Sequence, residues 1–127
     1  MMQYVADFET TTNENDCRVW AWAVCEIGDL ENVYIGTTID DFMYWCEERP
    51  ENIKVYFHNL KFDGNFWLSF LITEMGFQQG LIYNSPVDAS FKDKQELKNN
   101  EVVYLISSMG QWYTITFKYK GHLYTLK

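Results

Sequence analysis

Two short segments restrict most strongly what this chain can fold into. Residues 3–9 alternate in character and favour a strand, which ends in Asp7-Phe8-Glu9-Thr10. Since side chains two apart on a strand point to the same face, Asp7 and Glu9 are expected to lie together. The second segment follows a short apolar strand expected at residues 53–57, and Asp63 begins a helix there, from which it can reach the end of the first strand. Its sequence is Tyr56-Phe57-His58-Asn59-Leu60-Lys61-Phe62-Asp63-Gly64.

Three carboxylates gathered at one place suit hard divalent cations. Mg²⁺ and Mn²⁺ prefer carboxylate oxygens, and two such ions about 4 Å apart can activate a water and stabilise the leaving oxygen of a phosphodiester. Each residue also has a structural explanation. Asp-x-Glu alone is a weak signal, Asp63 is typical of the first turn of a helix, and His58 and the neighbouring aromatic residues are typical of a folded core. The combination favours a phosphodiester-cleaving metal site.

The rest of the chain predicts one α/β domain with a mixed sheet flanked by helices. Thr38 followed by Asp41 resembles a capping box and begins a helix that ends before Pro50. A second helix is expected at residues 62–75, with Gly76 as its C-terminal cap. The further strands are expected at residues 18–26, 31–35, 102–106, 110–119 and 122–126.

Three segments carry more specific expectations. Residues 10–16 have the composition of a polar turn. Residues 18–26 are apolar at both odd and even positions, which predicts a strand buried on both sides. Residues 83–101 are polar and contain few apolar residues, so we expect a surface loop or insertion there.

Composition restricts the cellular compartment in which the protein is expected. The chain has 127 residues, 47% of them apolar, and contains no apolar run of about 18 residues that could span a membrane. Its first residues lack the basic and apolar regions of a secretory signal. The three cysteines, Cys17, Cys25 and Cys46, are odd in number and show no C-x-x-C spacing, which predicts reduced thiols. We therefore expect a protein of a reducing cytosol.

The formal net charge of −8 stands against free binding to nucleic acid. Nucleic-acid-binding domains usually carry a basic patch, whereas Lys92, Lys94 and Lys98 are interleaved with acidic residues here. Three interpretations remain open: a small local DNA contact, a basic partner domain, or an acidic surface that is itself functional.

Four blocks occur in order along almost the whole chain: Asp7-Phe8-Glu9-Thr10-Thr11-Thr12, Asp16-Cys17-Arg18-Val19-Trp20-Ala21, the segment from Tyr56 to Gly64, and Met109-Gly110-Gln111-Trp112-Tyr113. Together they resemble the N-terminal 3′–5′ exonuclease domain of protein-primed, phage-type family B DNA polymerases. The resemblance implies an RNase H-like exonuclease fold with a mixed central sheet flanked by helices.

The resemblance also implies roles for individual residues. The catalytic residues, which are also the ligands of Mg²⁺ or Mn²⁺, would be Asp7, Glu9 and Asp63. Contacts to the 3′ end of single-stranded DNA would come from Thr10, Asn59 and Phe62, with supporting or DNA-contacting roles for Tyr56 and His58. An aromatic ring can stack on a terminal base without selecting sequence, and Asn or Thr can hydrogen-bond to sugar and phosphate oxygens.

One departure from the family concerns its third exonuclease motif, which supplies a further Asp on a later helix. Residues 104–127 contain no Asp, so this motif is absent. The polymerase modules of the family are absent as well. Residues 1–127 are therefore expected to form a single partial exonuclease domain, incomplete at the C-terminus, with weak or no activity alone unless a partner chain supplies a further side chain.

A second hypothesis is a protein without enzymatic activity. A phage or mobile element could reuse the half-domain as an acidic binding or inhibitor module, for example an anti-CRISPR or other anti-defence protein, against a basic nucleic-acid-binding host protein. Trp45, Trp67 and Trp112 would then be candidate interface aromatics, with core packing as the alternative for each. An exposed edge strand could also allow a dimer. A third hypothesis is a broken gene product without a role.

Overall fold

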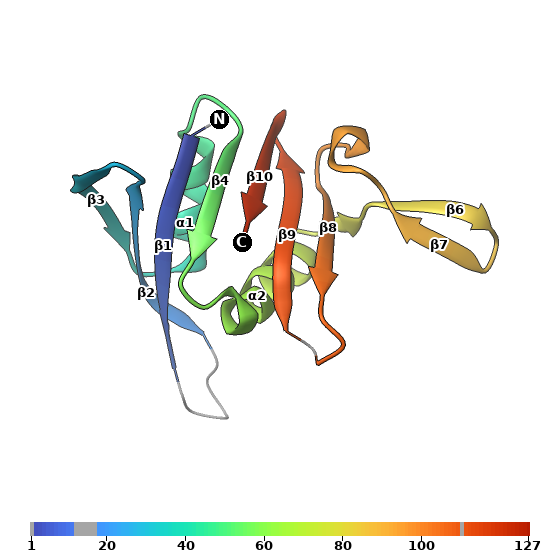
Figure 1. The fold of residues 1–127 in the computed structure, drawn as a ribbon, viewed down its shortest axis with the longest axis horizontal. Helices are drawn as coiled ribbons and strands as arrows, with labels where there is room; N and C mark the ends of the chain where they lie inside the picture. Colours follow the sequence, from blue (N-terminus) through green and yellow to red (C-terminus); the bar gives the residue numbers. More distant parts are fainter. Residues whose placement is uncertain (1, 12–17, 110) are drawn as a thin grey trace.

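The computed structural model describes residues 2–11, 18–109 and 111–127. Strands dominate this part of the chain, and two α-helices accompany them (Figure 1). In chain order the elements are β1 Met2–Thr10, β2 Val19–Glu26, β3 Asp29–Gly36, α1 Ile39–Glu47, β4 Ile53–Phe57, α2 Leu60–Ser69, a π-helical turn Phe70–Glu74, β5 Gln78–Gln79, β6 Leu81–Ser85, β7 Asp88–Phe91, a 3₁₀ turn Lys94–Glu96, β8 Glu101–Ile106, β9 Trp112–Tyr119 and β10 His122–Leu126.

Eight of the strands form one mixed sheet in the order β3-β2-β1-β4-β10-β9-β8-β5. The central strand β4 runs parallel to both β1 and β10, whereas β1 is antiparallel to β2 and β10 is antiparallel to β9. Helices α1 and α2 both lie behind the sheet in the view of Figure 1. The predicted α/β class with a mixed sheet is confirmed.

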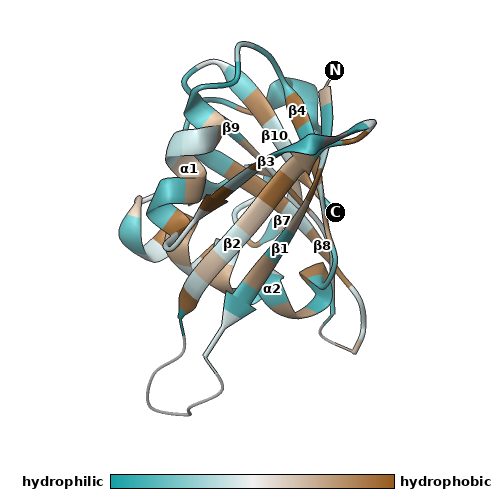
Figure 2. Ribbon diagram, turned by 90° about the vertical axis from the view of Figure 1, so that its left-hand side faces the viewer, coloured by the Kyte–Doolittle hydropathy of each residue, from teal (hydrophilic) through white to brown (hydrophobic). Residues whose placement is uncertain are grey.

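Strand β1 sorts its side chains between the two faces of the sheet. Tyr4, Ala6 and Phe8 are buried, while Asp7 and Glu9 between and after them are exposed. Figure 2 shows the resulting alternation of hydropathy along the strands. The two carboxylates therefore share a face, as their spacing predicts.

The core is aromatic and is centred on Trp67 of α2, which is fully buried. Its ring lies 5.8 Å from that of Phe8 and 5.4 Å from that of Phe42 between ring centroids, so it connects α2 with β1 and α1. Edge-to-face and offset ring pairs of this kind add about 0.5–1.5 kcal/mol each beyond burial of apolar area. The core thus fixes α2, and with it Asp63, against the sheet.

The local signals for helix ends and turns are confirmed where the structure describes them. Thr38 Oγ1 accepts a hydrogen bond of 3.1 Å from the backbone N–H of Asp41, and α1 ends at Glu47, before Pro50. Gly76, with φ of +73°, follows the π-helical turn that ends the second helical segment. Positive φ at this position favours glycine because it has no Cβ.

Residues 83–101, predicted as a surface loop or insertion, lie largely at the surface, but much of the segment is not a loop. This segment contributes to the β6–β7 hairpin, which extends away from the sheet in Figure 1, and to the short 3₁₀ turn. It is fastened to β8 by the ion pair between Lys92 Nζ and Glu101 Oε1, 2.9 Å apart. Both strands of the hairpin are largely exposed, and therefore their sequence shows no alternation of apolar and polar residues.

The expectation that residues 18–26 are buried on both sides is wrong. Val19, Trp22 and Val24 of β2 are buried, but Trp20 is 53% exposed. The two helices cover only one face of the sheet, so Ala21, Ala23 and Cys25 on the other face of β2 are only half-buried. Trp20 lies where the register between β1 and β2 shifts. The interface role considered for Trp45, Trp67 and Trp112 is replaced by the core alternative, because all three are buried.

Two features of composition can be followed in the described residues. No helix in residues 2–11, 18–109 and 111–127 is long and apolar enough to cross a membrane. Cys25 and Cys46 are free thiols, as predicted. Cys17, Gly110 and most of the polar turn predicted at residues 10–16 lie outside the described residues.

Candidate metal and nucleic-acid site

The site forms where β1 and β4 end side by side. The backbone N–H of His58 donates to the carbonyl of Ala6 over 3.1 Å, which extends the parallel pairing of these strands by one residue. The carbonyl of Asn59 then accepts from the N–H groups of Phe62 and Asp63 at 3.0 and 2.8 Å and opens α2. This sharp strand-to-helix connection places the first turn of α2 beside the end of β1.

A surface pocket of about 430 Å³ lies at this junction. It contains seven of the eight residues that the sequence suggested, together with Phe8. The lining residues are Asp7, Phe8, Glu9, Thr10, His58, Asn59, Phe62 and Asp63. Two segments about fifty residues apart in the sequence thus meet in one pocket.

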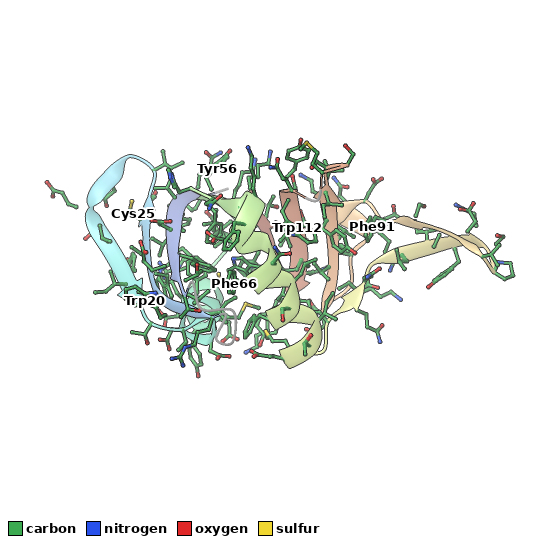
Figure 3. All side chains as sticks on the ribbon, turned by 90° about the horizontal axis from the view of Figure 1, so that it is seen from below. Trp20, Cys25, Tyr56, Phe66, Phe91 and Trp112 are labelled. Carbon is green, nitrogen blue, oxygen red and sulfur yellow. The ribbon has the colours of Figure 1, made fainter. Side chains whose placement is uncertain are left out.

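Tyr56 is the suggested site residue that does not line this pocket. It alternates with the buried residues Val55 and Phe57 of β4 and pairs with Val5 of β1. Figure 3 shows Tyr56 apart from Phe66 of α2 and from Trp112, which lies beside that helix. Phe8 lines the pocket but was not among the predicted site residues. Its position between Asp7 and Glu9 is the one sequence signal that could have identified it.

Asp63 is the most strongly perturbed carboxylate of the site. It is only 3% exposed, and its Oδ2 atom is buried without a hydrogen-bond partner among the described residues. Burial, followed by the charges of Asp7 and Glu9, raises the pKa of Asp63 to about 6, and His58 partly opposes this shift. An unpaired buried carboxylate facing two others is unfavourable unless a cation neutralises it.

These residues fit a divalent cation by their chemistry. Three carboxylates border one pocket, and the unpartnered oxygen of Asp63 supplies a free ligand atom. Among the described residues, no group of three or more His, Cys, Asp or Glu side chains already has the geometry of a metal site. Because Asp7 and Glu9 are exposed, their side chains are free to rotate toward an ion held at Asp63.

The mouth of the pocket offers groups suited to a nucleotide. The side chain of Phe62 is 53% exposed. Its ring centroid lies 6.0 Å from that of Phe66 in the same helix. Asn59 is exposed, and its side chain makes no capping hydrogen bond to α2. An exposed ring can stack on a base, and an amide can hydrogen-bond to sugar or phosphate oxygens.

Close packing behind Asp63 holds the first turn of α2 in place. Gly64 lies against the Trp112 ring so closely that a Cβ atom would overlap it. The indole Nε1–H of Trp112 donates to Asn65 Oδ1 over 3.0 Å, and Figure 3 shows Trp112 beside α2. Since Asp63 precedes these two residues directly, the Trp112 contact sets its position.

Replacing Gly64 with alanine should therefore destabilise the fold and displace Asp63. We expect a loss of about 1–3 kcal/mol in the free energy of unfolding, as for other overpacked sites. Urea denaturation measures this loss, and Ser69→Ala on the exposed side of the same helix is the control, with an expected change within about 0.5 kcal/mol. Equal stability of Gly64→Ala and the control would contradict the packing described here.

Known proteins with similar sequences are phage DNA polymerases, although no protein-family model matches the chain. The DNA polymerase of Bacillus phage M2 is 44% identical over 120 residues, and that of Bacillus phage phi29 is 38% identical over 120 residues. Each match covers 93% of this chain but only 18% of the relative. The DNA polymerase of Streptococcus phage Cp-1 is 29% identical over 138 residues, which covers 98% of this chain and 20% of the relative.

Solved structures agree with the sequence comparison. Phi29 DNA polymerase in an orthorhombic crystal form has a TM-score of 0.72 and 34% identity, over 98% of this chain and 20% of that chain. Phi29 DNA polymerase complexed with single-stranded DNA has a TM-score of 0.71 over the same shares. The fold therefore defines an exonuclease-like α/β domain. The chain is similar to the N-terminal region of phi29-type, protein-primed phage DNA polymerases and spans about a fifth of their length.

Proposed function

We propose that this chain carries a 3′–5′ exonuclease site that acts on single-stranded DNA with Mg²⁺ or Mn²⁺, and that its activity alone is weak. The observation that carries the proposal is the meeting of Asp7, Glu9 and Asp63 around one pocket, with a buried, unpartnered oxygen on Asp63. Two facts about similar proteins support it. They are DNA polymerases, and one of them has been solved with single-stranded DNA.

The carboxylates and the residues around them have different roles: the carboxylates bind metal and the neighbouring residues contact DNA. Asp7, Glu9 and Asp63 would hold a divalent ion, which would provide charge stabilisation and an activated water at the phosphodiester. Phe62 offers its exposed ring to the terminal base, which by comparison with other single-strand binders contributes about 1–3 kcal/mol. Asn59 and Thr10, which both line the pocket, donate hydrogen bonds to the sugar and phosphate.

Weak activity follows from the number of carboxylates. Residues 104–127 contain neither Asp nor Glu, so the pocket has no acidic side chain from that segment. With fewer negative ligands, a second cation is held less tightly, and loss of one source of electrostatic stabilisation typically lowers kcat by about 10²–10³. A carboxylate contributed by another polypeptide would restore part of that rate.

The decisive assay uses 5′-labelled single-stranded DNA with Mn²⁺ or Mg²⁺. We expect slow, stepwise shortening from the 3′ end, and none with the Asp7→Ala/Asp63→Ala double variant. A folded wild-type chain that does not shorten the DNA in Mn²⁺, even at high enzyme concentration, would overturn the proposal.

The role of Phe62 is tested separately by Phe62→Ala. Because the ring stacks on the substrate and lies outside the core, the variant should stay folded and bind single-stranded DNA about 5- to 150-fold more weakly. Tyr44→Ala, which removes another exposed aromatic ring, from α1, is the matched control. Fluorescence anisotropy of a labelled oligonucleotide measures both. A loss of affinity of the same size in both variants would contradict a specific stacking role.

A second candidate function is that of an acidic binding module against a basic, nucleic-acid-binding host protein, including an anti-defence inhibitor. The observation that favours it is the distribution of charge: residues 19–48 contain seven acidic residues and no Lys, Arg or His. Such a module tolerates alanine at Asp7, Glu9 and Asp63, whereas an exonuclease does not.

A further inference from the structure

Strand β3 forms one edge of the sheet and presents an unusual amount of apolar surface there. It stands at one end of the strand order and pairs with β2 alone among the described strands. Its side chains Val33, Tyr34 and Ile35 are 53%, 43% and 78% exposed. The opposite edge, by contrast, is formed by the two-residue strand β5. A long, apolar edge strand is a template for pairing with another extended segment.

A groove of about 560 Å³ runs between this edge strand and helix α1. Tyr34 and Ile35 from β3 and Tyr44 and Trp45 from α1 supply its apolar lining. Trp45 is 5% exposed, and its indole Nε1–H has no hydrogen-bond partner among the described residues. An edge strand with a helix beside it is the arrangement in which many domains bind extended peptides by strand addition.

The groove lies in the most acidic part of the chain. Asp41 and Glu48 are among its lining residues. The acidic residues between positions 19 and 48 are Glu26, Asp29, Glu31, Asp40, Asp41, Glu47 and Glu48. Their seven negative charges are nearly as many as the net charge of −8 that the whole chain carries.

Two cations from outside this segment offset only part of the negative charge. Arg49 is stacked over the rings of Tyr34 and Trp45 at 5.2 and 4.8 Å and lies 3.5 Å from Glu48. Lys120 lies 3.3 Å from Glu47. Asp41 and Glu48 in the groove and Asp29 and Glu31 on β3 outnumber the cation beside them, Arg49, so the groove attracts a cationic segment and repels an acidic one.

We propose that the groove between β3 and α1 binds an extended, basic peptide of another protein, which adds to β3 as a further strand. Charge decides between the possible occupants, because a second copy of this chain that paired through β3 would bring Asp29 and Glu31 of its own strand to the same edge. The inference deepens the acidic-module candidate. It is independent of the exonuclease site, since no residue that lines the carboxylate pocket lines this groove.

The first test uses a fluorescein-labelled nine-residue peptide in which Lys alternates with Val and Thr, and a counterpart with Glu in place of Lys. Fluorescence anisotropy should show at least about tenfold tighter binding of the Lys peptide. Glu48→Lys should weaken that binding at least about fivefold, whereas Glu96→Lys, the same charge change on an exposed residue outside the groove, should change it less than twofold. Equal binding of the two peptides, or equal effects of the two variants, would overturn the proposal.

The second test asks whether the backbone of β3 makes the contact. Methylation of alternate backbone nitrogens of the Lys peptide removes its hydrogen-bond donors on one edge, and we expect binding to fall at least about tenfold. Amide hydrogen exchange of residues in β3 should slow when the unmodified peptide binds. Undiminished binding of the methylated peptide, or protection confined to other strands, would refute strand addition.

A third measurement separates a foreign peptide from a second copy of the chain. Sedimentation of the protein alone should show a monomer at micromolar concentration, for the wild type and for Ile35→Lys. A concentration-dependent dimer that Ile35→Lys abolishes would assign the edge to a second copy and overturn the proposal. None of these readouts uses DNA or a divalent metal, so failure of the exonuclease assay has no bearing on them.

Discussion

Replacing Asp63 with asparagine is expected to abolish metal-dependent cleavage and, at the same time, to stabilise the metal-free protein at neutral pH. The carboxyl of Asp63 is 3% exposed, and burial together with Asp7 and Glu9 raises its pKa to about 6. At pH 7 the group is ionised in an environment that disfavours the charge. A neutral amide removes that penalty, which for a shift of this size is at most about 3 kcal/mol.

The sign of the pH dependence follows from the same shift. Between the ordinary value of 3.8 and the folded value of about 6, the folded protein binds this proton more tightly than the unfolded chain. The contribution of Asp63 to stability is therefore present at low pH and is lost as pH rises through about 6. The Asp63→Asn variant does not lose this stability as pH rises. Its free energy of unfolding should therefore exceed that of the wild type by a margin that grows from pH 4 to pH 7.

Urea denaturation at pH 4 and pH 7, with and without Mn²⁺, measures both effects. Mn²⁺ should stabilise the wild type at pH 7, since it binds the folded site, and should leave Asp63→Asn unchanged. Asp88→Asn, the same substitution on the exposed strand β7, is the control and should alter neither stability nor its response to Mn²⁺. An Asp63→Asn variant that is less stable than the metal-free wild type at pH 7 would contradict the electrostatic account.

The largest loss of stability is expected from Trp67→Ala. This fully buried ring contacts aromatic rings from β1, α1, β4, β9 and the π-helical turn that follows α2, so its removal leaves a cavity at the centre of the core. Truncation of a buried Trp typically lowers the free energy of unfolding by about 3–5 kcal/mol. The rings concerned are those of Phe8, Phe42, Phe57, Phe70 and Phe117.

Two further variants show whether the loss comes from packing. Trp67→Phe keeps a ring and removes an indole N–H that has no partner among the described residues, so it should lose less than half as much stability as Trp67→Ala. Trp20→Ala, at a 53% exposed position, should change stability by less than about 1 kcal/mol. Similar losses in all three variants, measured by denaturant unfolding, would argue against Trp67 as the centre of the core.

The sequence predicted those parts of the fold that local signals define. Residues 53–57 form β4 with the predicted bounds, because buried and half-buried side chains alternate along it. The Thr38 cap and the glycine at position 76 were recognisable, since each satisfies a local backbone requirement. The carboxylate pocket was also predictable in outline, because the spacing in β1 fixes the face and the connection after β4 fixes the end of the sheet.

The parts that were missed depend on contacts distant in sequence or on exposure. The β6–β7 hairpin is exposed on both faces, so no apolar alternation marks its strands. The exposure of Trp20 accompanies the register shift at the end of the β1–β2 pairing, which no local pattern in the sequence marks. The groove at β3 requires the edge position of that strand, which only the complete strand order reveals.

The central claim, that Asp7, Glu9 and Asp63 form a divalent-cation site, is tested most directly by titrating ¹⁵N-labelled protein with Mn²⁺ and following paramagnetic broadening of the backbone amide signals. We predict saturable broadening centred on the ends of β1 and β4 and on the first turn of α2, and its loss in the Asp7→Ala/Asp63→Ala variant. Broadening centred instead on the acidic groove between β3 and α1, or unchanged in the double variant, would contradict the account.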